Sequence, residues 1–260
     1  MLLQDKTLVV TGGSSGIGAA IARRAAAEGA RVVIDHIGST EAAEQLVSDI
    51  TEAGGQAIAV EADVSQVADL QRLVDTAVRT YGRLDVMVNN AGIEAGKSLL
   101  DTPEELYDAV MAVNLKGAFF GTQLAAKQFI AQRDRGDGDG GVVINISSVH
   151  EDWPMPGNSV YCLAKGGMRM LTRNTGVELG KEGVRVVNVA PGAIRTPMNA
   201  DTMADDEDLA ALRAAIPVGR LGEADEIADT VVFLASDRSG YATATTMFVD
   251  GGIMQGSVGL

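Results

Sequence analysis

Short runs of β-branched and apolar residues alternate with longer amphipathic stretches along the whole chain, and this alternation restricts the fold more than any other feature. Strands that are apolar throughout are typical of a parallel sheet that helices cover on both faces. Right-handed crossovers then produce a doubly wound α/β sheet, here of about seven strands. We therefore predict one domain of this class over residues 1–260.

The predicted strands and helices follow one another in regular order. Strands are expected at Leu8–Val10, Arg31–Asp35, Gln56–Glu61, Leu84–Asn89, Val142–Ile146, Val184–Val189 and Met247–Val249. Helices are expected at Gly16–Gly29, Thr40–Ala53, Gln66–Tyr81, Pro103–Gln132, Asn158–Glu182 and Ala224–Ala235. The segment Arg133–Gly141 is rich in Asp and Gly, but its carboxylates lack the spacing of a calcium loop. We predict a solvated surface connection there.

Charge and composition exclude several classes of function. The net charge of −14 repels nucleic acids and anionic membranes. Cys162 is the single cysteine and the two histidines, His36 and His150, lie far apart, so we expect neither a disulfide framework nor a metal site. No stretch approaches the ~20 apolar residues of a membrane span, and the N-terminal residues lack a signal-peptide pattern. A soluble, cytoplasmic protein is expected.

The first predicted strand runs into a glycine-rich turn, Thr11–Gly18, that opens a helix. Glycines let backbone amides approach a pyrophosphate, and the helix N-terminus favours an anion. The turn residues expected to bind a dinucleotide are Gly12, Ser14, Ser15, Gly16, Ile17 and Gly18. Because the spacing G-x-x-x-G-x-G differs from the standard G-x-G-x-x-G, the turn by itself is also compatible with simple tight packing of helix on strand.

Two further motifs follow other strands at the same predicted edge. Asp63 and Val64 come after the third strand, and Asn90, Ala91 and Gly92 come after the fourth. The carboxyl ends of parallel strands meet at one edge of a sheet, where open α/β sheets bind their ligands. The joint placement of these motifs predicts a dinucleotide site at that edge.

Tyr161 and Lys165 are four residues apart and share one face of a predicted helix. A tyrosine pKa of ~10 is too high for a base at neutral pH, and a neighbouring cation lowers it. The spacing therefore suits a tyrosine general acid/base, although an ordinary amphipathic helix is the alternative. Ser148 ends the fifth predicted strand, and Asn114 lies inside a predicted helix, where asparagine is a poor helix former.

In this order and spacing, these residues resemble the short-chain dehydrogenase/reductase family over essentially the whole chain. The resemblance is carried by Thr11–Gly18, Asn89–Gly92, Asn114, Ser148, Tyr161, Lys165 and Pro191–Thr196. It implies a Rossmann-type domain that binds a nicotinamide dinucleotide, and the family's usual assembly is a homotetramer. A non-catalytic, dinucleotide-sensing member of the fold is the contrasting hypothesis. The intact set of four polar residues argues against it, because nothing structural requires those types together.

The same resemblance implies roles for the catalytic group. Tyr161 would be the general acid/base, and Lys165 would lower its pKa and hold the nicotinamide ribose. Ser148 would hydrogen-bond the substrate oxygen. Asn114 would hold a water that links Lys165 to solvent.

Roles in cofactor binding follow from the resemblance as well. Asp63 would bind the adenine amino group, and Asn90 would lie at the adenosine side. The residues expected to cover the nicotinamide are Pro191, Gly192, Ile194 and Thr196.

The choice between NAD and NADP depends on the end of the second strand, at Asp35 and His36. A carboxylate there binds the 2′-hydroxyl of NAD and repels the 2′-phosphate of NADP. Neither Lys nor Arg follows this strand, and Ser15 takes a turn position where NADP-using relatives often carry a basic residue. Asp35 comes one residue earlier than the family pattern, and such a shift reverses the side-chain direction. We predict NAD, with NADP left open and a simple turn role for Asp35 as the alternative.

The substrate prediction is also local. Glu94, His150 and the tail Asp250–Met254 resemble bacterial glucose 1-dehydrogenases, in which the first two positions lie near the sugar. Oxidation of D-glucose at C1 to the lactone is therefore expected. Arg195, where those enzymes typically have Asn, would suit a different, acidic substrate. The alternative reaction is reduction of another ketone or a 3-oxoacyl thioester, and the acidic segment Pro197–Ala215 is expected to form a mobile lid.

Overall fold

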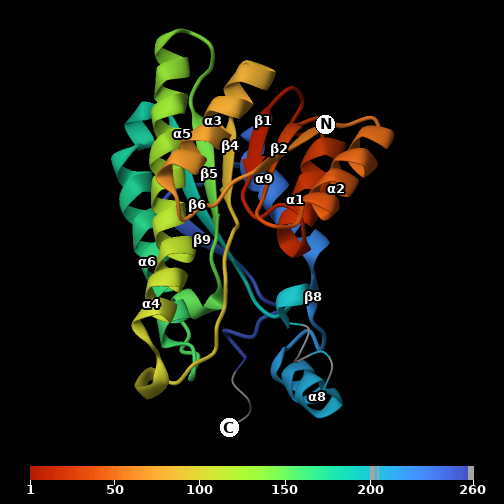
Figure 1. Cartoon of the computed structure of the whole chain (residues 1–260), viewed down its shortest axis with the longest axis vertical. Helices are drawn as coiled ribbons and strands as arrows, with labels where there is room; N and C mark the ends of the chain where they lie inside the picture. The colour runs from red at the N-terminus through yellow and green to blue at the C-terminus, as the bar shows by residue number, and fades with distance from the viewer. Residues whose placement is uncertain (200–202, 204, 257–260) are drawn as a thin grey trace.

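A seven-stranded parallel sheet forms the centre of the computed structural model, which describes residues 1–199, 203 and 205–256 (Figure 1). Its strands are β1 (Thr7–Val10), β2 (Arg31–His36), β3 (Gln56–Glu61), β4 (Val86–Asn89), β5 (Gly141–Ile146), β6 (Val184–Pro191) and β9 (Thr245–Val249). They lie in the order β3-β2-β1-β4-β5-β6-β9, and the order reverses between β1 and β4. This arrangement confirms the predicted doubly wound α/β fold.

Helices cover both faces of the sheet (Figure 1). One face carries α1 (Gly16–Ala27), α2 (Thr40–Glu52) and α9 (Ala224–Ala235). The other carries α3 (Val67–Tyr81), α4 (Glu104–Met111), α5 (Gly117–Asp134) and α6 (Ser159–Glu178). Beyond the carboxyl ends of the strands lie α8 (Asp206–Ala215) and a short parallel pair, β7 (Ile194–Arg195) with β8 (Gly222–Glu223).

The apolar strands are explained by the two layers of helices. Successive side chains of a strand point to opposite faces of the sheet. Leu8 and Val10 pack in the core under α1 and α9, whereas Val9 packs in the core under α3 and α5. Both faces of β1 are therefore covered, and all four of its residues are buried. Such coverage explains why the strand is apolar at successive positions, which is the pattern that predicted a parallel sheet.

The predicted helix Pro103–Gln132 is divided in the structure. It consists of α4, a π-helical turn at Ala112–Lys116, and α5, which continues to Asp134. The π turn contains the asparagine that the sequence marked as a poor helix former. The predicted helix at 158–182 ends at Glu178 and is followed by a 3₁₀ turn. The Asp- and Gly-rich connection after α5 is mostly exposed, as expected.

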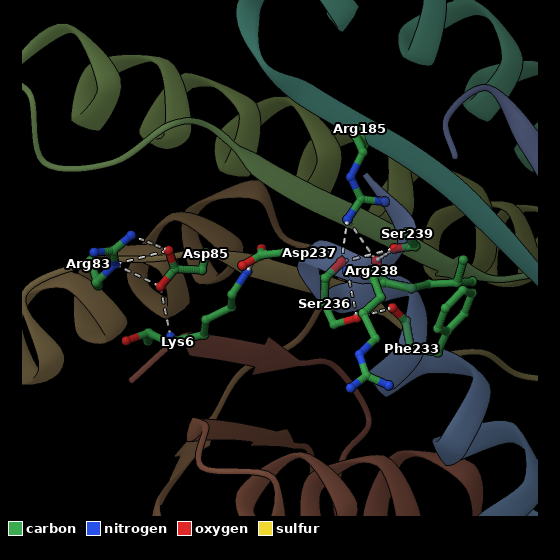
Figure 2. Close-up of polar contacts among 11 residues, drawn as sticks. Lys6, Arg83, Asp85, Arg185, Phe233, Ser236, Asp237, Arg238 and Ser239 are labelled. Carbon is green, nitrogen blue, oxygen red and sulfur yellow. Dashed lines mark hydrogen bonds and ion pairs between the residues drawn. The ribbon is translucent and has the colours of Figure 1, made fainter. Parts of the chain in front are cut away.

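Polar contacts join the amino ends of β1 and β6 to the end of α9 and the segment after it (Figure 2). Arg185 on β6 donates hydrogen bonds to the carbonyl oxygens of Leu234 at 2.8 Å and Ala242 at 3.2 Å, and so caps the C-terminal end of α9. Lys6, just before β1, pairs with Asp237 at 2.5 Å. These contacts lie at the end of the sheet opposite the strand carboxyl ends.

The glycine turn after β1 depends on a buried carboxylate from β2. Asp35 is 2% exposed, and its Oδ2 accepts a hydrogen bond from the backbone N–H of Gly12 at 3.0 Å. Its Oδ1 has no hydrogen-bond partner among the residues that the structure describes. Burial raises the pKa of Asp35 to about 7, against the opposing effect of the Gly12 hydrogen bond, and the charges of Asp69 and Asp63 raise this pKa further.

This raised pKa predicts that Asp35 makes the free protein less stable as the pH rises. The carboxyl group has a higher pKa in the folded chain than its ordinary 3.8. The stabilising contribution of the protonated Asp35 to the free energy of unfolding is therefore fully present below pH 3.8 and is lost as the pH rises through about 7. Asp35→Asn keeps an acceptor for Gly12 and removes the buried charge.

We expect Asp35→Asn to melt above the wild type by more than ~3 °C at pH 8 without cofactor, and by clearly less at pH 5. Thermal unfolding of both proteins across this pH range checks the prediction. A variant that is less stable than the wild type at pH 8 would contradict it.

Candidate active site

A cleft of about 1600 Å³ runs along the carboxyl ends of the strands. The predicted cofactor-binding residues that line it are Gly12, Ser14, Ser15, Gly16, Ile17, Asp35, His36, Asp63, Val64, Asn90, Ala91, Gly92, Pro191, Gly192, Ile194 and Thr196. The predicted catalytic and substrate residues that line it are Glu94, Ser148, His150, Tyr161 and Lys165. Gly18, Asn114 and Arg195 lie outside its lining.

Gly18 acts through packing. A Cβ atom there would lie 2.3 Å from the carbonyl oxygen of Gly12 and 2.6 Å from Nδ2 of Asn90. The same Nδ2 donates hydrogen bonds to the carbonyl oxygens of Thr11 at 2.8 Å and Gly12 at 3.1 Å. Asn90 therefore uses its side chain to hold the glycine turn, and Gly18 leaves room for it.

The cleft has the features that a dinucleotide requires. Gly12 and Gly16 have φ angles of 59° and 51°, which side chains other than glycine rarely adopt. Two buried polar atoms, Asp35 Oδ1 and His36 Nδ1, have no hydrogen-bond partner in the described part of the chain. Both residues line the cleft. Asp35 therefore lies at the cleft even though it comes one residue earlier in the sequence than the family pattern places its acidic residue. Lys165 is the only Lys or Arg among the described lining residues.

Ser148, Tyr161 and Lys165 come together where β5 ends beside α6. Ser148 lies just before a 3₁₀ turn, Val149–Glu151, and is hydrogen-bonded to Tyr161. Lys165 donates a hydrogen bond from Nζ to the carbonyl oxygen of Ile146 at 2.9 Å. The same Nζ lies 5.5 Å from the centre of the Tyr161 ring. The structure therefore brings the three predicted side chains to one point of the cleft.

Burial disfavours the charged forms of both members of the Tyr–Lys pair. It raises the pKa of Tyr161 to about 12, although the hydrogen bond with Ser148 opposes this shift. It lowers the pKa of Lys165 to about 8, which the charge of Glu151 opposes. The expected lowering of the Tyr161 pKa by Lys165 is not found in the cofactor-free protein, where Glu94 and Cys162 raise this pKa in addition to burial. Shifted pKa values inside a cleft are typical of active sites.

Asn114 holds a loop. Its Oδ1 accepts a hydrogen bond from the N–H of Ile93, and its Nδ2 donates one to the carbonyl oxygen of Ile93, both at 2.8 Å. The π turn places this side chain against the segment after β4. The predicted role of holding a water near Lys165 stays a prediction.

Two predicted substrate residues lie close to Tyr161. The His150 ring is 6.3 Å from the Tyr161 ring, and its Nδ1 is 3.1 Å from the carbonyl oxygen of Trp153. Glu94 accepts a hydrogen bond from Asn158 Nδ2 at 3.2 Å. The wall also contains Trp153 itself, which the sequence analysis missed. The sequence did offer a signal for Trp153, because an aromatic residue next to prolines lies between the two predicted site residues Ser148 and Tyr161.

Arg195 stands apart from this group. Its Nε lies 3.2 Å from Oε1 of Glu223, across the β7–β8 pair. In the expected lid, Asp208, Leu212 and Ala215 of α8 line the cleft, while residues 200–202 and 204 lie outside the described residues. The mobility of this segment stays a prediction.

Among the described residues, no group of three or more His, Cys, Asp or Glu side chains is placed to hold a metal ion. In the same part of the chain, no helix combines the length and apolar character needed to span a membrane.

Several curated proteins are similar to this chain over nearly its whole length. The 3β-hydroxysteroid dehydrogenase 1 of Eggerthella lenta is 43% identical, over 96% of this chain and 94% of its own. The L-rhamnose 1-dehydrogenase (NAD(P)(+)) of Azotobacter vinelandii is also 43% identical, over 97% and 98%. Glucose 1-dehydrogenase 2 of Bacillus subtilis is 37% identical, over 96% and 95%.

The fold and a family profile agree with these relatives. The structure of a short-chain dehydrogenase/reductase from Serratia marcescens superposes with a TM-score of 0.90 at 37% identity. The match covers 98% of this chain and 100% of that one. The family model described as Enoyl-(Acyl carrier protein) reductase matches residues 12–254. The chain therefore belongs to the short-chain dehydrogenase/reductase family of oxidoreductases.

Proposed function

We propose that this chain is a single-domain, NAD-dependent dehydrogenase that oxidises an alcohol with Tyr161 as its general base. The observation that carries the proposal is the meeting of Tyr161, Ser148 and Lys165 in the cleft that also exposes the glycine turn. A bound nicotinamide ring supplies a hydride acceptor. The remaining requirement is a group that takes the hydroxyl proton, and Tyr161 is in position for this role.

Each side chain has a defined part in the proposed reaction. Tyr161 removes the hydroxyl proton from the substrate, and Ser148 orients the same oxygen. Because burial raises the pKa of Tyr161 to about 12, the phenolate needs a nearby positive charge. The Lys165 ammonium, 5.5 Å from the ring centre, supplies it.

The cofactor preference follows from the end of β2. The buried Oδ1 of Asp35 is an acceptor suited to a ribose hydroxyl. A 2′-phosphate would meet this carboxylate, and among the described residues that line the cleft near β2 there is neither Lys nor Arg to bind it. These contacts favour NAD over NADP. The name of the A. vinelandii relative leaves both cofactors in play.

An aldose that is oxidised at its anomeric hydroxyl is the substrate class that we propose, with D-glucose first. Glu94 and His150 provide polar groups beside Tyr161. Relatives named for L-rhamnose and for glucose support a sugar. Arg195 no longer argues for an acidic substrate, because it pairs with Glu223.

A secondary alcohol of a steroid is the second candidate. Trp153, Met155 and Ile253 line the cleft and offer an apolar surface. The E. lenta relative is named for such a substrate. Reduction of a ketone or a 3-oxoacyl thioester uses the same Tyr161 as a general acid, and a dinucleotide-sensing protein would bind cofactor without turnover.

The first test concerns the base. Tyr161→Phe removes the phenol and leaves the rest of the cleft intact, so we expect kcat to fall by at least ~100-fold while the Kd for NAD stays near the wild-type value. Steady-state kinetics and cofactor titration measure the two effects. Tyr81→Phe, at the far end of α3, is the matched control and should retain full activity. Substantial residual turnover in Tyr161→Phe would refute the assignment.

The second test concerns the substrate and the cofactor. NAD and NADP are each offered with glucose, rhamnose, deoxy-sugars, a 3β-hydroxysteroid and simple alcohols, and absorbance of the reduced nicotinamide is followed. We expect glucose with NAD to be used best. Deoxy-sugars should be far poorer, by up to ~10⁴-fold, because each missing hydroxyl leaves a polar group of the pocket unpaired.

In the same assay, Glu94→Ala should raise the KM for the sugar and leave the KM for NAD unchanged. Efficient oxidation of the steroid without any sugar oxidation would replace the first substrate with the second. A higher kcat/KM with NADP would overturn the cofactor preference.

We also propose that the protein is a cytoplasmic homotetramer. Large apolar side chains lie exposed on α6 (Leu163, Met170 and Val177) and near the C-terminal end (Tyr241 and Met247). The apolar character of the C-terminal segment Tyr241–Leu260 also supports burial at an interface, although residues 257–260 lie outside the described residues. Light scattering at micromolar concentration should give about four times the chain mass of 27.0 kDa, and a monomer would contradict the proposal.

A further inference from the structure

Glu151 is a carboxylate that is buried behind the active site. It ends the 3₁₀ turn that begins after Ser148, its side chain is 0% exposed, and it does not line the cleft. A buried charge is costly unless it is paired and hydrogen-bonded. The hydrogen-bonding and charged partners of the Glu151 carboxylate therefore indicate its role.

Both carboxylate oxygens of Glu151 have partners on other elements. Oε2 accepts a hydrogen bond from Asn188 Nδ2 on β6 at 2.9 Å. Oε1 accepts one from Thr246 Oγ1 on β9 at 2.7 Å and lies 3.7 Å from Nε of Arg169 on α6. The turn that carries Ser148 is thereby tied to two strands and to the catalytic helix.

The hydrogen bonds beyond Asn188 all run in one direction. Asn89 Nδ2 donates to Asn145 Oδ1 at 2.8 Å, and Asn145 Nδ2 donates to Thr172 Oγ1 at 2.8 Å. The Thr172 hydroxyl donates to Asn188 Oδ1, and Asn188 donates to Glu151. Such a chain polarises each of its members. It ends at a group that only accepts, which is the behaviour of an ionised carboxylate.

The charge of Glu151 acts on Lys165. Arg169, which contacts Glu151, follows Lys165 by one helical turn on α6. The negative charge of Glu151 raises the pKa of Lys165, against the larger lowering caused by burial. Lys165 needs its positive charge in order to favour the Tyr161 phenolate.

We propose that Glu151 is a positioning residue that holds the Ser148 turn against α6 and keeps Lys165 charged through its buried negative charge. The inference rests on the proposed roles of Tyr161 and Lys165. It adds an anion outside the cleft to the groups that govern proton transfer.

The charged and titratable groups around this pair come from three elements. Tyr161 lies on α6 with Lys165 and Arg169, and the last of these also binds Asp152. Glu151 belongs to the 3₁₀ turn, as does His150, whose ring lies 6.3 Å from the Tyr161 ring. Beyond β4, Glu94 raises the pKa of Tyr161, as does Cys162 next to it on the helix.

The test follows the protonation of Lys165 directly. The chain has six lysines, so ¹³Cε-lysine labelling gives few NMR signals, and the Lys165 signal is identified by its loss in Lys165→Met. In the cofactor-free wild type we expect its titration midpoint near about 8. Glu151→Gln keeps the size, keeps one acceptor oxygen for Asn188 and places an N–H donor beside the Thr246 hydroxyl, which can also accept. It removes the charge and should lower this midpoint by about one pH unit.

Kinetics give a second readout. In Glu151→Gln, the high-pH plateau of kcat/KM should fall about tenfold. Once the Tyr161–Lys165 pair has lost one proton, the active form has a phenolate and an ammonium, and a pKa of Lys165 that is one unit lower makes this form about tenfold rarer. The Kd for NAD should stay near the wild-type value. If the wild type oxidises no alcohol, the proposed function fails, while the NMR titration still tests the role of Glu151.

Two further variants separate charge from structure. Asp152→Asn removes the other carboxylate that binds Arg169 and should leave the Lys165 midpoint unchanged. Glu151→Asp keeps the charge, so it should lower thermal stability and leave the midpoint close to that of the wild type. Because the charge is retained, a midpoint lowered by about one pH unit in Glu151→Asp would overturn the proposal even if Glu151→Gln does not fold. An unchanged midpoint in folded Glu151→Gln, or an equal shift in Asp152→Asn or Glu151→Asp, would overturn the proposal.

Discussion

The parallel pairing of β1 with β2 on one side and β4 on the other decides where this protein places its polar groups. All seven strands run in the same direction, so the turns that follow them open at one edge. Where the strand order reverses, neighbouring turns diverge and leave a cleft. The glycine turn, Asp35 and Ser148 all line this cleft although they are far apart in the chain. The cofactor binding and proton transfer that we propose would thus depend on one topological feature.

Burial at this edge also sets the proton affinity of the groups that meet there. It raises the pKa of Asp35 to about 7 and lowers that of Lys165 to about 8. Burying a carboxylate away from water is costly, and Asp35 and Glu151 differ in how this cost is offset. Asp35 has one oxygen without a partner in the described part of the chain and faces the cleft, which suits a ligand. Glu151 has partners on both oxygens and does not line the cleft.

Local sequence patterns predicted much of this structure. The apolar strands, the glycine turn and the four-residue spacing of Tyr161 and Lys165 all lie within single segments, so their periodicity is visible in the chain. Other features depend on contacts between segments. Asn114 signalled a weak point in a helix, but its two hydrogen bonds with Ile93, which lies after β4, could not be predicted from its own segment.

The sequence by itself determined the parallel α/β class, the family resemblance and the identity of most, but not all, of the predicted residues that line the cleft. Tertiary structure decided which polar groups are buried and which partners they have. Arg195 turned to Glu223 rather than to the substrate site, and Glu151 found Asn188 and Thr246 on two separate strands. Neither contact leaves a periodic signal in the sequence, because the partners are distant in the chain and each strand carries only one of them.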